Sequence, residues 1–376
     1  MIMDIVRTIK IKLNPDEATK SILVETMAAY TEAFNAVCQY AWDNQVFNGV
    51  ELHKATYYDH RSLYQLPAQL TCSARAKATE SLKSARALLK KKRTVSCPQS
   101  KRSPIRYDAN SYSVWFDRQE ISLSTKHGRV KVPFVLPDYY QEYATWKHTS
   151  ADLIINRKGD VYLNVVMQTE MAQEPSTEDV LGVDLGIVNP AVDSDGNKYG
   201  SDHWQAVEKR IFELTKRLQS KGTKSAKRHL KNLSGRRNRF RKDCDHVLSK
   251  QIVKAAPVGS TIAMEDLTDI RKRVKVRKAQ RRRVHGWSFA QLQMFVGYKA
   301  AMKSVAVAYI DPRYTSQKCS SCGHTAKNNR KDQATFVCKE CHFECHADYN
   351  AAMNIRDNYL KSRAAVNQPI VSAPRG

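Results

Sequence analysis

Acidic residues are scarce in this chain relative to basic ones. The 376 residues include 62 Lys and Arg against 37 Asp and Glu, so the formal net charge at pH 7 is +25. Such an excess is far beyond what solubility requires. It favours a polyanionic partner, because each cation that pairs with a phosphate of DNA or RNA releases a condensed counterion. The alternative is a merely solvated basic surface, and the clustering of the charge argues against it.

Long apolar runs are also missing. The first residues, MIMDIVRTIKIKLNP, alternate in polarity and lack the apolar core of a secretory signal peptide. No uninterrupted apolar stretch approaches the length that spans a membrane. We therefore expect a protein of the prokaryotic cytoplasm, in the cytosol or on the nucleoid, with no membrane partner. Nine cysteines in a reducing compartment should not form disulfides, so their spacing needs another explanation.

Two kinds of pattern divide the N-terminal half. Residues 3–13 alternate as a strand does, and short alternating runs continue from about residue 104, with turns at His127-Gly128 and Lys158-Gly159-Asp160. The residues between them have helical periodicity. We expect a β-rich, barrel-like domain made of 1–14 and 104–172, with an all-helical insertion at 15–103. The polar segment 171–179 is typical of a linker.

The first helix of the insertion is predicted from its start signals and its apolar stripe. Asn14 supplies a cap, Pro15 a first-turn proline, and Asp16 and Glu17 acids for the positive end of the helix. A second helix is expected over 68–92. The buried stripe of the first helix should comprise apolar residues at three- and four-residue steps, namely Ile22, Leu23, Met27, Tyr30, Phe34, Val37, Ala41 and Trp42.

Three acids in the C-terminal half occupy positions that suit metal binding. Asp184 lies in the apolar strand-like run VLGVDLG, and Glu265 ends a second apolar run, GSTIAMED. Asp348 opens a helix-like segment, DYNAAMNI. Carboxylates from distant positions can share one site if their strands are neighbours, and Mg²⁺ prefers such oxygen ligands. Two Mg²⁺ ions about 3.5–4 Å apart would activate water and stabilise the leaving oxygen of a phosphodiester.

Four cysteines have the spacing of a structural zinc site. Cys319 and Cys322 form one C-x₂-C pair, Cys338 and Cys341 form another, and 15 residues separate the pairs. Four thiolates leave no open coordination position, so the Zn²⁺ is expected to be structural. Spare candidate ligands lie nearby, at His324, His342, Cys345 and His346, but the paired spacing favours Cys341 over Cys345.

Two basic stretches flank the predicted acids. The run RKRVKVRKAQRRR at 271–283 contains no acid and should contact phosphate or remain disordered without it. The segment 205–243 is predicted to be helical, with an apolar stripe that includes Val207, Ile211, Leu214 and Leu218. Its other face is rich in Lys and Arg. Charge of one sign on both sides of a metal site favours a nucleic-acid channel.

Four motifs in this order resemble the TnpB family, the RNA-guided nucleases encoded by insertion sequences and related to type V CRISPR effectors. They are GVDLGIVNPAV at 182–192, MED at 264–266, DPRYTSQKCSSCG at 311–323 and HADYNAAMNI at 346–355. The resemblance covers roughly residues 178–356. The N-terminal half agrees with the family only in size and order.

The resemblance implies an α/β fold with a ribonuclease-H-like (RuvC) nuclease core formed by 178–312 and 346–376. Its catalytic, metal-binding acids map onto Asp184, Glu265 and Asp348, and a zinc ribbon at 313–345 is inserted before the last of them. The β-rich domain would act as a wedge and the helical insertion as a recognition domain. The implied partners are a guide RNA derived from the transposon end and a double-stranded target DNA with a short adjacent motif.

Two other functions remain open at this stage. A cut-and-paste transposase would use the same three acids for strand transfer and would need no RNA. An RNA-guided repressor would bind DNA without cutting it, and the three intact acids argue against this function. Asp266 should lie on the opposite strand face from Glu265, so we expect a structural role for it.

Overall fold

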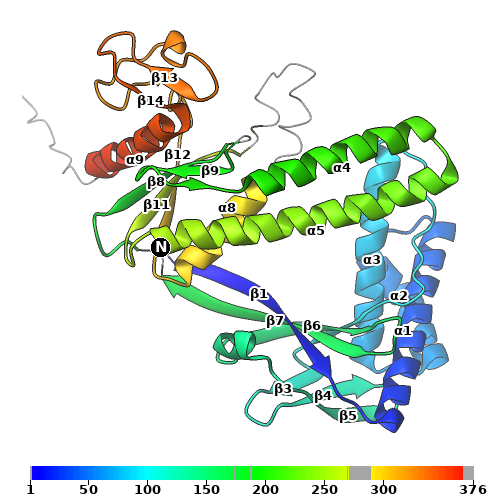
Figure 1. Ribbon diagram of the computed structural model, residues 1–376. Helices are drawn as coiled ribbons and strands as arrows, with labels where there is room; N and C mark the ends of the chain where they lie inside the picture. Colours follow the sequence, from blue (N-terminus) through cyan, green and yellow to red (C-terminus); the bar gives the residue numbers. More distant parts are fainter. Residues whose placement is uncertain (1, 173, 187–188, 269, 271–288, 367–376) are drawn as a thin grey trace, which may run out of the picture. The chain divides into compact units, whose positions relative to one another are not determined.

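The computed structural model describes residues 2–172, 174–186, 189–268, 270 and 289–366, which form two compact units (Figure 1). One unit is Asp4–Glu170, and the other is Met171–Gly376 together with Met1–Met3. The mixed α/β fold expected from the sequence is confirmed. The finer division into four domains stays a prediction. The basic run at 271–283 lies outside the described residues.

The Asp4–Glu170 unit contains two antiparallel sheets. The four-stranded sheet has the order β1 (Ile2–Leu13), β7 (Val161–Ala172), β6 (Lys147–Ile155) and β2 (Ile105–Asp108). The three-stranded sheet has the order β3 (Tyr112–Trp115), β4 (Glu120–Thr125) and β5 (Gly128–Pro133), and a 3₁₀ helix follows at Asp138–Tyr143. The strand predicted at 3–13 thus pairs with the later strands. An isolated bridge between Leu13 and Phe134 connects the two sheets, and the barrel-like arrangement stays a prediction.

Three helices make up the insertion, one more than the sequence indicated: α1 (Glu17–Asp43), α2 (Gly49–Tyr64) and α3 (Ala68–Lys90). The cap of α1 is Asp16 and not Asn14, because the Asp16 carboxylate accepts a hydrogen bond of 2.7 Å from the Thr19 amide. The apolar stripe is confirmed. Its buried members are Leu23, Met27, Tyr30, Phe34, Val37 and Ala41, and the two end members, Ile22 and Trp42, are partly exposed.

The second unit is built on a five-stranded sheet whose order is β10-β9-β8-β11-β12. The central strands β8 (Val180–Asp184) and β11 (Thr261–Glu265) run parallel, and β12 (Ala306–Ile310) runs parallel to β11. The short strands β9 (Ala191–Asp193) and β10 (Lys198–Tyr199) form a hairpin with its turn around Asp195-Gly196. Because β8 and β11 are parallel neighbours, their carboxyl ends lie at the same edge of the sheet.

Helices cover both faces of this sheet. On one face, α5 (Lys224–Ala255) and α8 (Phe289–Ala301) bury alternate strand residues, which include Leu181, Val183, Ile262 and Met264. On the other face, α9 (Ala347–Val366) packs Ile355 against Ala263 and Ile310. Side chains of a strand alternate between faces, so Asp184 and Glu265 lie on the face that α9 covers.

The segment 205–243, predicted to be one helix, belongs to a hairpin of two helices. Its two members, α4 (Asp202–Lys221) and α5, run side by side in Figure 1 and share a small apolar core that includes Leu218, Ala226 and Leu233. The single-helix prediction is wrong because Gly222 adopts a left-handed φ of 64° that ends α4. Thr223 then caps α5, accepting a hydrogen bond from the Ala226 amide.

The segment between β12 and α9 folds on two small strands, β13 (Thr335–Val337) and β14 (Glu344–His346), with a 3₁₀ turn at Lys327–Asn329. It has little apolar core of its own, chiefly Phe336, Cys319 and Cys338. A fold this small needs a further source of stability. Among the helices that the structure describes, none has the length and apolar character needed to cross a bilayer.

Gly182 fixes how closely α9 approaches β8. A Cβ at this position would lie 2.2 Å from the Ala352 carbonyl oxygen and 2.8 Å from the Arg356 nitrogen, both of which belong to the α9 backbone. Backbone atoms cannot swing aside as a side chain can. The contact between the helix and the strand therefore requires glycine here.

We expect Gly182→Ala to destabilise the Met171–Gly376 unit by about 1–3 kcal/mol, because α9 must shift away from the sheet. Gly297→Ala in α8 is the matched control, since a Cβ there meets no atom within 4 Å and alanine favours a helix. Thermal unfolding of both variants checks this. A Gly182→Ala protein as stable as the wild type would contradict the role of this contact.

Candidate metal centre and cysteine cluster

Asp184 and Glu265 lie next to each other at the carboxyl edge of the sheet. The parallel register pairs Met264 with Val183, and the next residue on each strand is an acid. Both residues are partly buried. Strand pairing and side-chain alternation together therefore bring two like charges side by side on one face.

Asp348 joins them from α9. It lies in the first turn of that helix, where the positive end of the helix dipole stabilises an acid, and it is only 5% exposed. The Asn189 side chain donates a hydrogen bond of 2.8 Å to its Oδ2, and Arg330 donates one of 3.3 Å to its Oδ1. Both carboxylate oxygens are thus oriented by the protein.

Glu265 is held by residues from two other segments. The Thr315 hydroxyl donates a hydrogen bond of 2.5 Å to Glu265 Oε1, and Gln293 of α8 donates one of 2.7 Å to the Glu265 carbonyl. Thr315 is buried and belongs to the turn that follows β12. The side chain and the backbone of Glu265 are therefore both fixed.

The three acids lie close enough to affect one another electrostatically. The pKa of Asp184 is raised well above its ordinary value, first by burial and then by the negative charges of Glu265 and Asp348, while Arg330 opposes the shift. Burial also raises the pKa of Glu265, and the Thr315 hydrogen bond lowers it. A buried group of like charges is costly unless a cation compensates it. One arginine for three acids leaves negative charge that suits a bound divalent ion.

The spacing of the acids bears on how many ions could bind. Among the residues that the structure describes, the four cysteines alone place three or more ligand atoms within 4.8 Å of one another. The three carboxylates are spread more widely than one small coordination shell. Two-ion sites hold their metals about 3.5–4 Å apart, so their ligands also span a wider region. The donor set fits hard cations such as Mg²⁺.

Three residues that contact the acids were not anticipated from the sequence: Asn189, Thr315 and Arg330. Asn189 and Thr315 stand within the motifs GVDLGIVNPAV and DPRYTSQKCSSCG, so their place beside the acids could have been inferred from proximity. Arg330 gave no such signal, because it is one of several basic residues in the cysteine-containing segment. It also donates hydrogen bonds to the carbonyls of Asp332 and Gln333, which fix its position.

The four predicted cysteines converge in space. Cys319 and Cys341 have their sulfur atoms 3.7 Å apart, and those of Cys322 and Cys338 are 3.6 Å apart. In a tetrahedral site with Zn–S bonds of about 2.3 Å, neighbouring sulfurs lie about 3.8 Å apart. The cluster is consistent with a structural zinc, and it excludes Cys345, as the paired spacing predicted.

The two cysteine pairs have the same local geometry. The Gly323 amide bonds to the Cys319 carbonyl, and the His342 amide bonds to the Cys338 carbonyl in the same way. Gly323 has a φ of 81° and His342 a φ of 59°, both left-handed. Each pair therefore forms a tight turn that directs both sulfurs inward, and the second turn does so without glycine.

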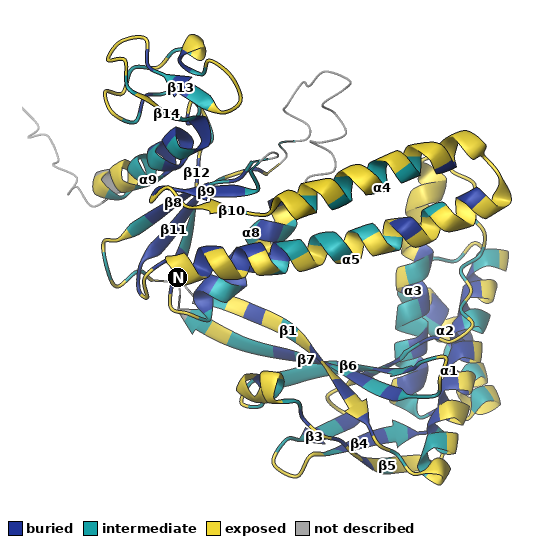
Figure 2. Cartoon of the chain, in the orientation of Figure 1, coloured by how far each residue is buried: buried dark blue, intermediate teal, exposed yellow. Residues whose placement is uncertain are grey.

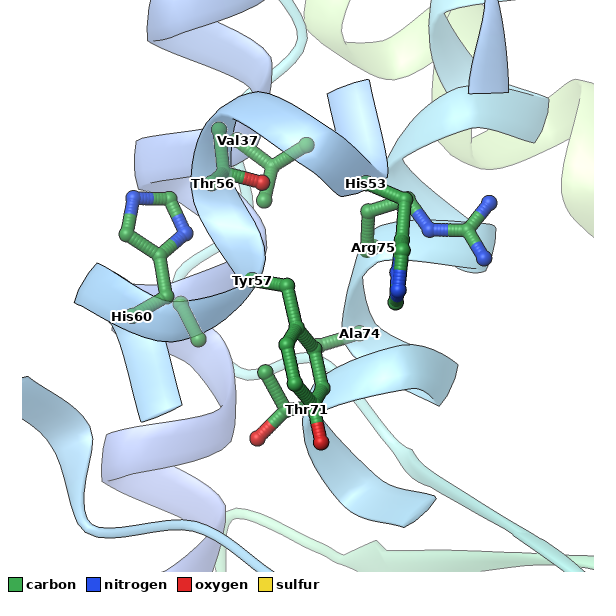
Figure 3. Close-up of a pocket in the computed structure, with 9 residues that line it drawn as sticks. Val37, His53, Thr56, Tyr57, His60, Thr71, Ala74 and Arg75 are labelled. Carbon is green, nitrogen blue, oxygen red and sulfur yellow. The ribbon is translucent and has the colours of Figure 1, made fainter. Parts of the chain in front are cut away.

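A small cavity in the other unit is a weaker candidate. It lies among α1, α2 and α3 and is lined by residues that include His53, Tyr57, His60 and Arg75 (Figure 3). Nitrogens of His53, His60 and Arg75 are buried there without a hydrogen-bond partner in the described part of the chain. The space holds little more than one water molecule and has no acid in its lining, so we assign no catalysis to it.

Two family models match parts of this chain. Residues 163–284 match the family model OrfB_IS605, described as "Probable transposase", and residues 289–355 match the Cas12f1-like TNB domain. The second match spans the cysteine cluster and ends after Asp348. A TnpB-like protein of Methanocaldococcus jannaschii, MJ0751, is 28% identical over 64% of this chain and 91% of its own length. These matches support the predicted place of the chain in the TnpB family.

Other TnpB relatives are larger. The CRISPR-associated endodeoxyribonuclease Cas12f1 of Sulfoacidibacillus thermotolerans is 33% identical, and the alignment covers 55% of this chain and 52% of that protein. The chain thus spans about half the length of this relative. A solved Cas12f1–sgRNA–target DNA complex matches with a TM-score of 0.58 at 16% identity, covering 91% of this chain and 83% of that one. This match supports the likeness in fold.

We expect the purified protein to contain about one zinc ion per chain and Cys322→Ser to lose it, with unfolding of the cysteine segment. Cys345→Ser is the matched control, because Cys345 lies close by in β14 but outside the cluster. Elemental analysis and proteolysis of the two variants check the assignment. Zinc retained in Cys322→Ser, or lost in Cys345→Ser, would identify a different ligand set.

Asp184→Asn should stabilise the metal-free protein, because it removes one of three mutually repelling charges. A gain of a few degrees in Tm is expected, since each 1 kcal/mol shifts Tm by roughly 2–4 °C at this size. Added Mg²⁺ should raise the Tm of the wild type more than that of the variant. Asp195→Asn, an exposed acid in the β9–β10 turn, is the control. Equal responses to Mg²⁺ would argue against metal binding at Asp184.

Proposed function

We propose that this chain is a Mg²⁺-dependent, RNA-guided DNA endonuclease, with Asp184, Glu265 and Asp348 as its catalytic, metal-binding acids. The observation that carries the proposal is the convergence of these three acids, from two strand ends and one helix start, in a chain that matches the TnpB family. All three positions that the family motifs predict are carboxylates. The finer statements about metal, substrate and residue roles belong to this proposal.

Side chains of the protein would hold the metal ions and orient the metal-binding acids. Two bound Mg²⁺ ions would supply an activated water and stabilise the leaving oxygen of the scissile phosphate. Asn189 and Thr315 keep Asp348 and Glu265 in fixed orientations. Arg330 places a positive charge beside Asp348, where it can approach a phosphate as well as a carboxylate. Such prior orientation matters because small displacements of a ligand reduce the rate strongly.

The sheet supports the predicted ribonuclease-H-like core. Three consecutive strands, β8, β9 and β10, form an antiparallel meander, and β11 and β12 are then added in parallel on the other side of β8. We propose that the nuclease domain comprises 178–312 and 346–376, with the zinc ribbon at 313–345 inserted. We assign 1–14 and 104–172 to the wedge domain and 15–103 to the recognition domain.

Guide RNA and target DNA are the proposed partners. The net charge of +25 fits a polyanion, and the solved Cas12f1 relative is a complex with single-guide RNA and target DNA. Sequence would be read by pairing of the guide with the target strand, while the protein binds the heteroduplex by its shape and reads a short flanking motif. A guide derived from the transposon end follows from the family resemblance.

One rival has a specific observation in its favour. The family model that matches 163–284 is described as a probable transposase, and strand transfer by a transposase also uses three acids. A transposase predicts joined DNA products and no need for RNA. A guided repressor predicts binding without cleavage, and the three acids would then have no function.

The decisive test uses protein purified from cells that express its native locus. Co-purifying RNA is sequenced, and the complex is incubated with matching DNA, with and without Mg²⁺. We expect Mg²⁺-dependent cleavage of matching DNA only. Asp184→Asn should bind RNA and DNA as the wild type does and reduce cleavage by several orders of magnitude, because it removes a metal ligand and not a phosphate contact.

Asp266→Asn is the matched control for the cleavage test, because Asp266 adjoins Glu265 and is predicted to be structural. It should cleave nearly as well as the wild type. Joined DNA products without RNA would establish the transposase, and guided binding without cutting would establish the repressor. Full cleavage by Asp184→Asn would refute the proposed metal centre.

A further inference from the structure

The first half of α5 carries charge of one sign only. Residues 224–242 include nine Lys and Arg and no Asp or Glu. Like charges three or four residues apart on a helix repel each other and lower its stability. Figure 2 shows that most of this part of the hairpin is exposed. The repulsion therefore has a cost that the apolar core of the hairpin must offset.

Two of these nine residues are used by the fold. Arg237 Nη2 lies 2.6 Å from Glu208 Oε2, and Arg241 Nε lies 2.7 Å from Glu208 Oε1, so one acid of α4 holds two arginines of α5. Burial raises the pKa of Glu208, but the hydrogen bonds from Arg237 and Arg241 outweigh it and leave that pKa below its ordinary value. These two arginines therefore stabilise the packing of α5 against α4.

The other seven basic residues are exposed, and none has an ion pair within the part of the chain that the structure describes. Five of them lie along a single face, at steps of three or four residues except for one step of eight across Gly235. We call this row the α5 stripe: Lys224, Arg228, Lys231, Arg239 and Lys242. At 1.5 Å per residue the row is about 27 Å long.

Gly235 occupies the central position of the stripe, four residues after Lys231 and four before Arg239. Glycine is unfavourable inside a helix, and nothing in the fold requires it here. A Cβ would meet no atom within 4 Å except Arg239 Nη1, at an ordinary contact distance of 3.5 Å. The backbone at Gly235 is also helical, with no positive φ. At the middle of the stripe the helix backbone is therefore partly exposed, and the atom nearest to a Cβ there is the end of the flexible Arg239 side chain.

We propose that the α5 stripe lies along the sugar–phosphate backbone of a nucleic-acid duplex, with Gly235 at the point of closest approach. This inference rests on the proposed function, which it deepens by assigning a surface to the duplex. The cations on either side of Gly235 would pair with phosphates. The glycine would let the backbone of the duplex come nearer to α5 than any side chain allows.

A duplex fits the stripe better than a single strand does. A row of charges on a straight helix is matched by a partner that is itself straight over about 27 Å, or about eight base pairs at 3.4 Å each. Proteins that bind single strands add aromatic side chains on which bases stack, and the stripe contains none. The contacts go to phosphate, so no sequence preference is expected from this surface.

The first experiment removes charge from the stripe of the full chain. Arg228→Gln with Arg239→Gln is compared with Lys209→Gln with Lys216→Gln, exposed basic residues of α4 outside the stripe. Each protein is titrated with an RNA–DNA duplex of about 20 base pairs at several salt concentrations. The stripe variant should lose about 1.8 from the slope of log K against log salt, at roughly 0.9 per phosphate contact. The control should keep the wild-type slope.

The second experiment adds bulk without changing charge. Gly235→Leu should raise the Tm, because leucine favours a helix, and yet weaken duplex binding about tenfold or more by holding the backbone away. Ser234→Leu adds the same side chain at the preceding residue, which is exposed and lies outside the stripe, and should leave binding unchanged. Unchanged binding by Gly235→Leu, or a lowered Tm, would overturn the assignment of Gly235.

Further measurements distinguish the possible nucleic-acid partners, and they test this inference separately from the proposed function. An all-DNA duplex of the same sequence shows whether the stripe distinguishes the two kinds of duplex. If the stripe variants lose as much affinity for single-stranded RNA as for the duplex, the preference for a duplex is overturned. If the wild type cleaves guided DNA while the stripe variants bind duplex normally, this inference fails alone. If the wild type binds duplex through the stripe but never cleaves, the proposed function fails alone.

Discussion

The direct contact of α9 with β8 is the constraint on which the candidate metal centre depends. Three acids repel one another, and nothing in their own chemistry would bring them together without a cation. The apolar residues of α9 and the sheet supply the opposing free energy, at about 1.5–3 kcal/mol for each large side chain buried. Gly182 removes the side chain that would otherwise separate the two elements. The position of Asp348 follows from this packing.

The cysteine segment has a similar dependence on the helix that follows it. Asn350 and Asn354 are buried on α9 and form hydrogen bonds with the backbone of the segment. The Asn350 side chain bonds to Lys318 and Ser320. The Asn354 side chain bonds to Thr315 and Lys318. The same segment carries Thr315 and Arg330 to Glu265 and Asp348. Because its own core is small, the closure of the cysteine cluster and the anchoring on α9 act together. A change in the cysteine cluster should therefore also affect the positions of Glu265 and Asp348.

Much of this arrangement could be predicted from local signals. The alternation of the apolar runs that end in Asp184 and Glu265 indicates strands, and the C-x₂-C pairs indicate the cluster, because each pattern is contained in a few neighbouring residues. The family resemblance supplied the grouping of the three acids. The structure adds the physical reasons, which are the parallel register of β8 and β11 and the close approach at Gly182.

The errors and omissions concern features that depend on weaker or more distant signals. The break at Gly222-Thr223 combines a C-terminal glycine with an N-cap threonine, but the basic periodicity on both sides hid it. The helix α2 begins at the cap Asn48 and buries few residues, chiefly Leu52 and Thr56, so it shows little apolar periodicity. Alternation predicts strands and not which strands pair, so it could not give the division of the β-rich domain into two sheets. Arg330 reaches Asp348 only through tertiary folding, so no local pattern could reveal it.

The hairpin of α4 and α5 shows how structural and surplus charge can be told apart. Glu208 forms ion pairs with two arginines on the inner side, so those charges serve the fold. No comparable partner exists among the described residues for the stripe, although one acid at a neighbouring turn would have relieved the repulsion. Helix stability also favours almost any residue over glycine at position 235. Two separate departures from what the helix alone prefers coincide on one face, and a polyanion lying against that face accounts for both.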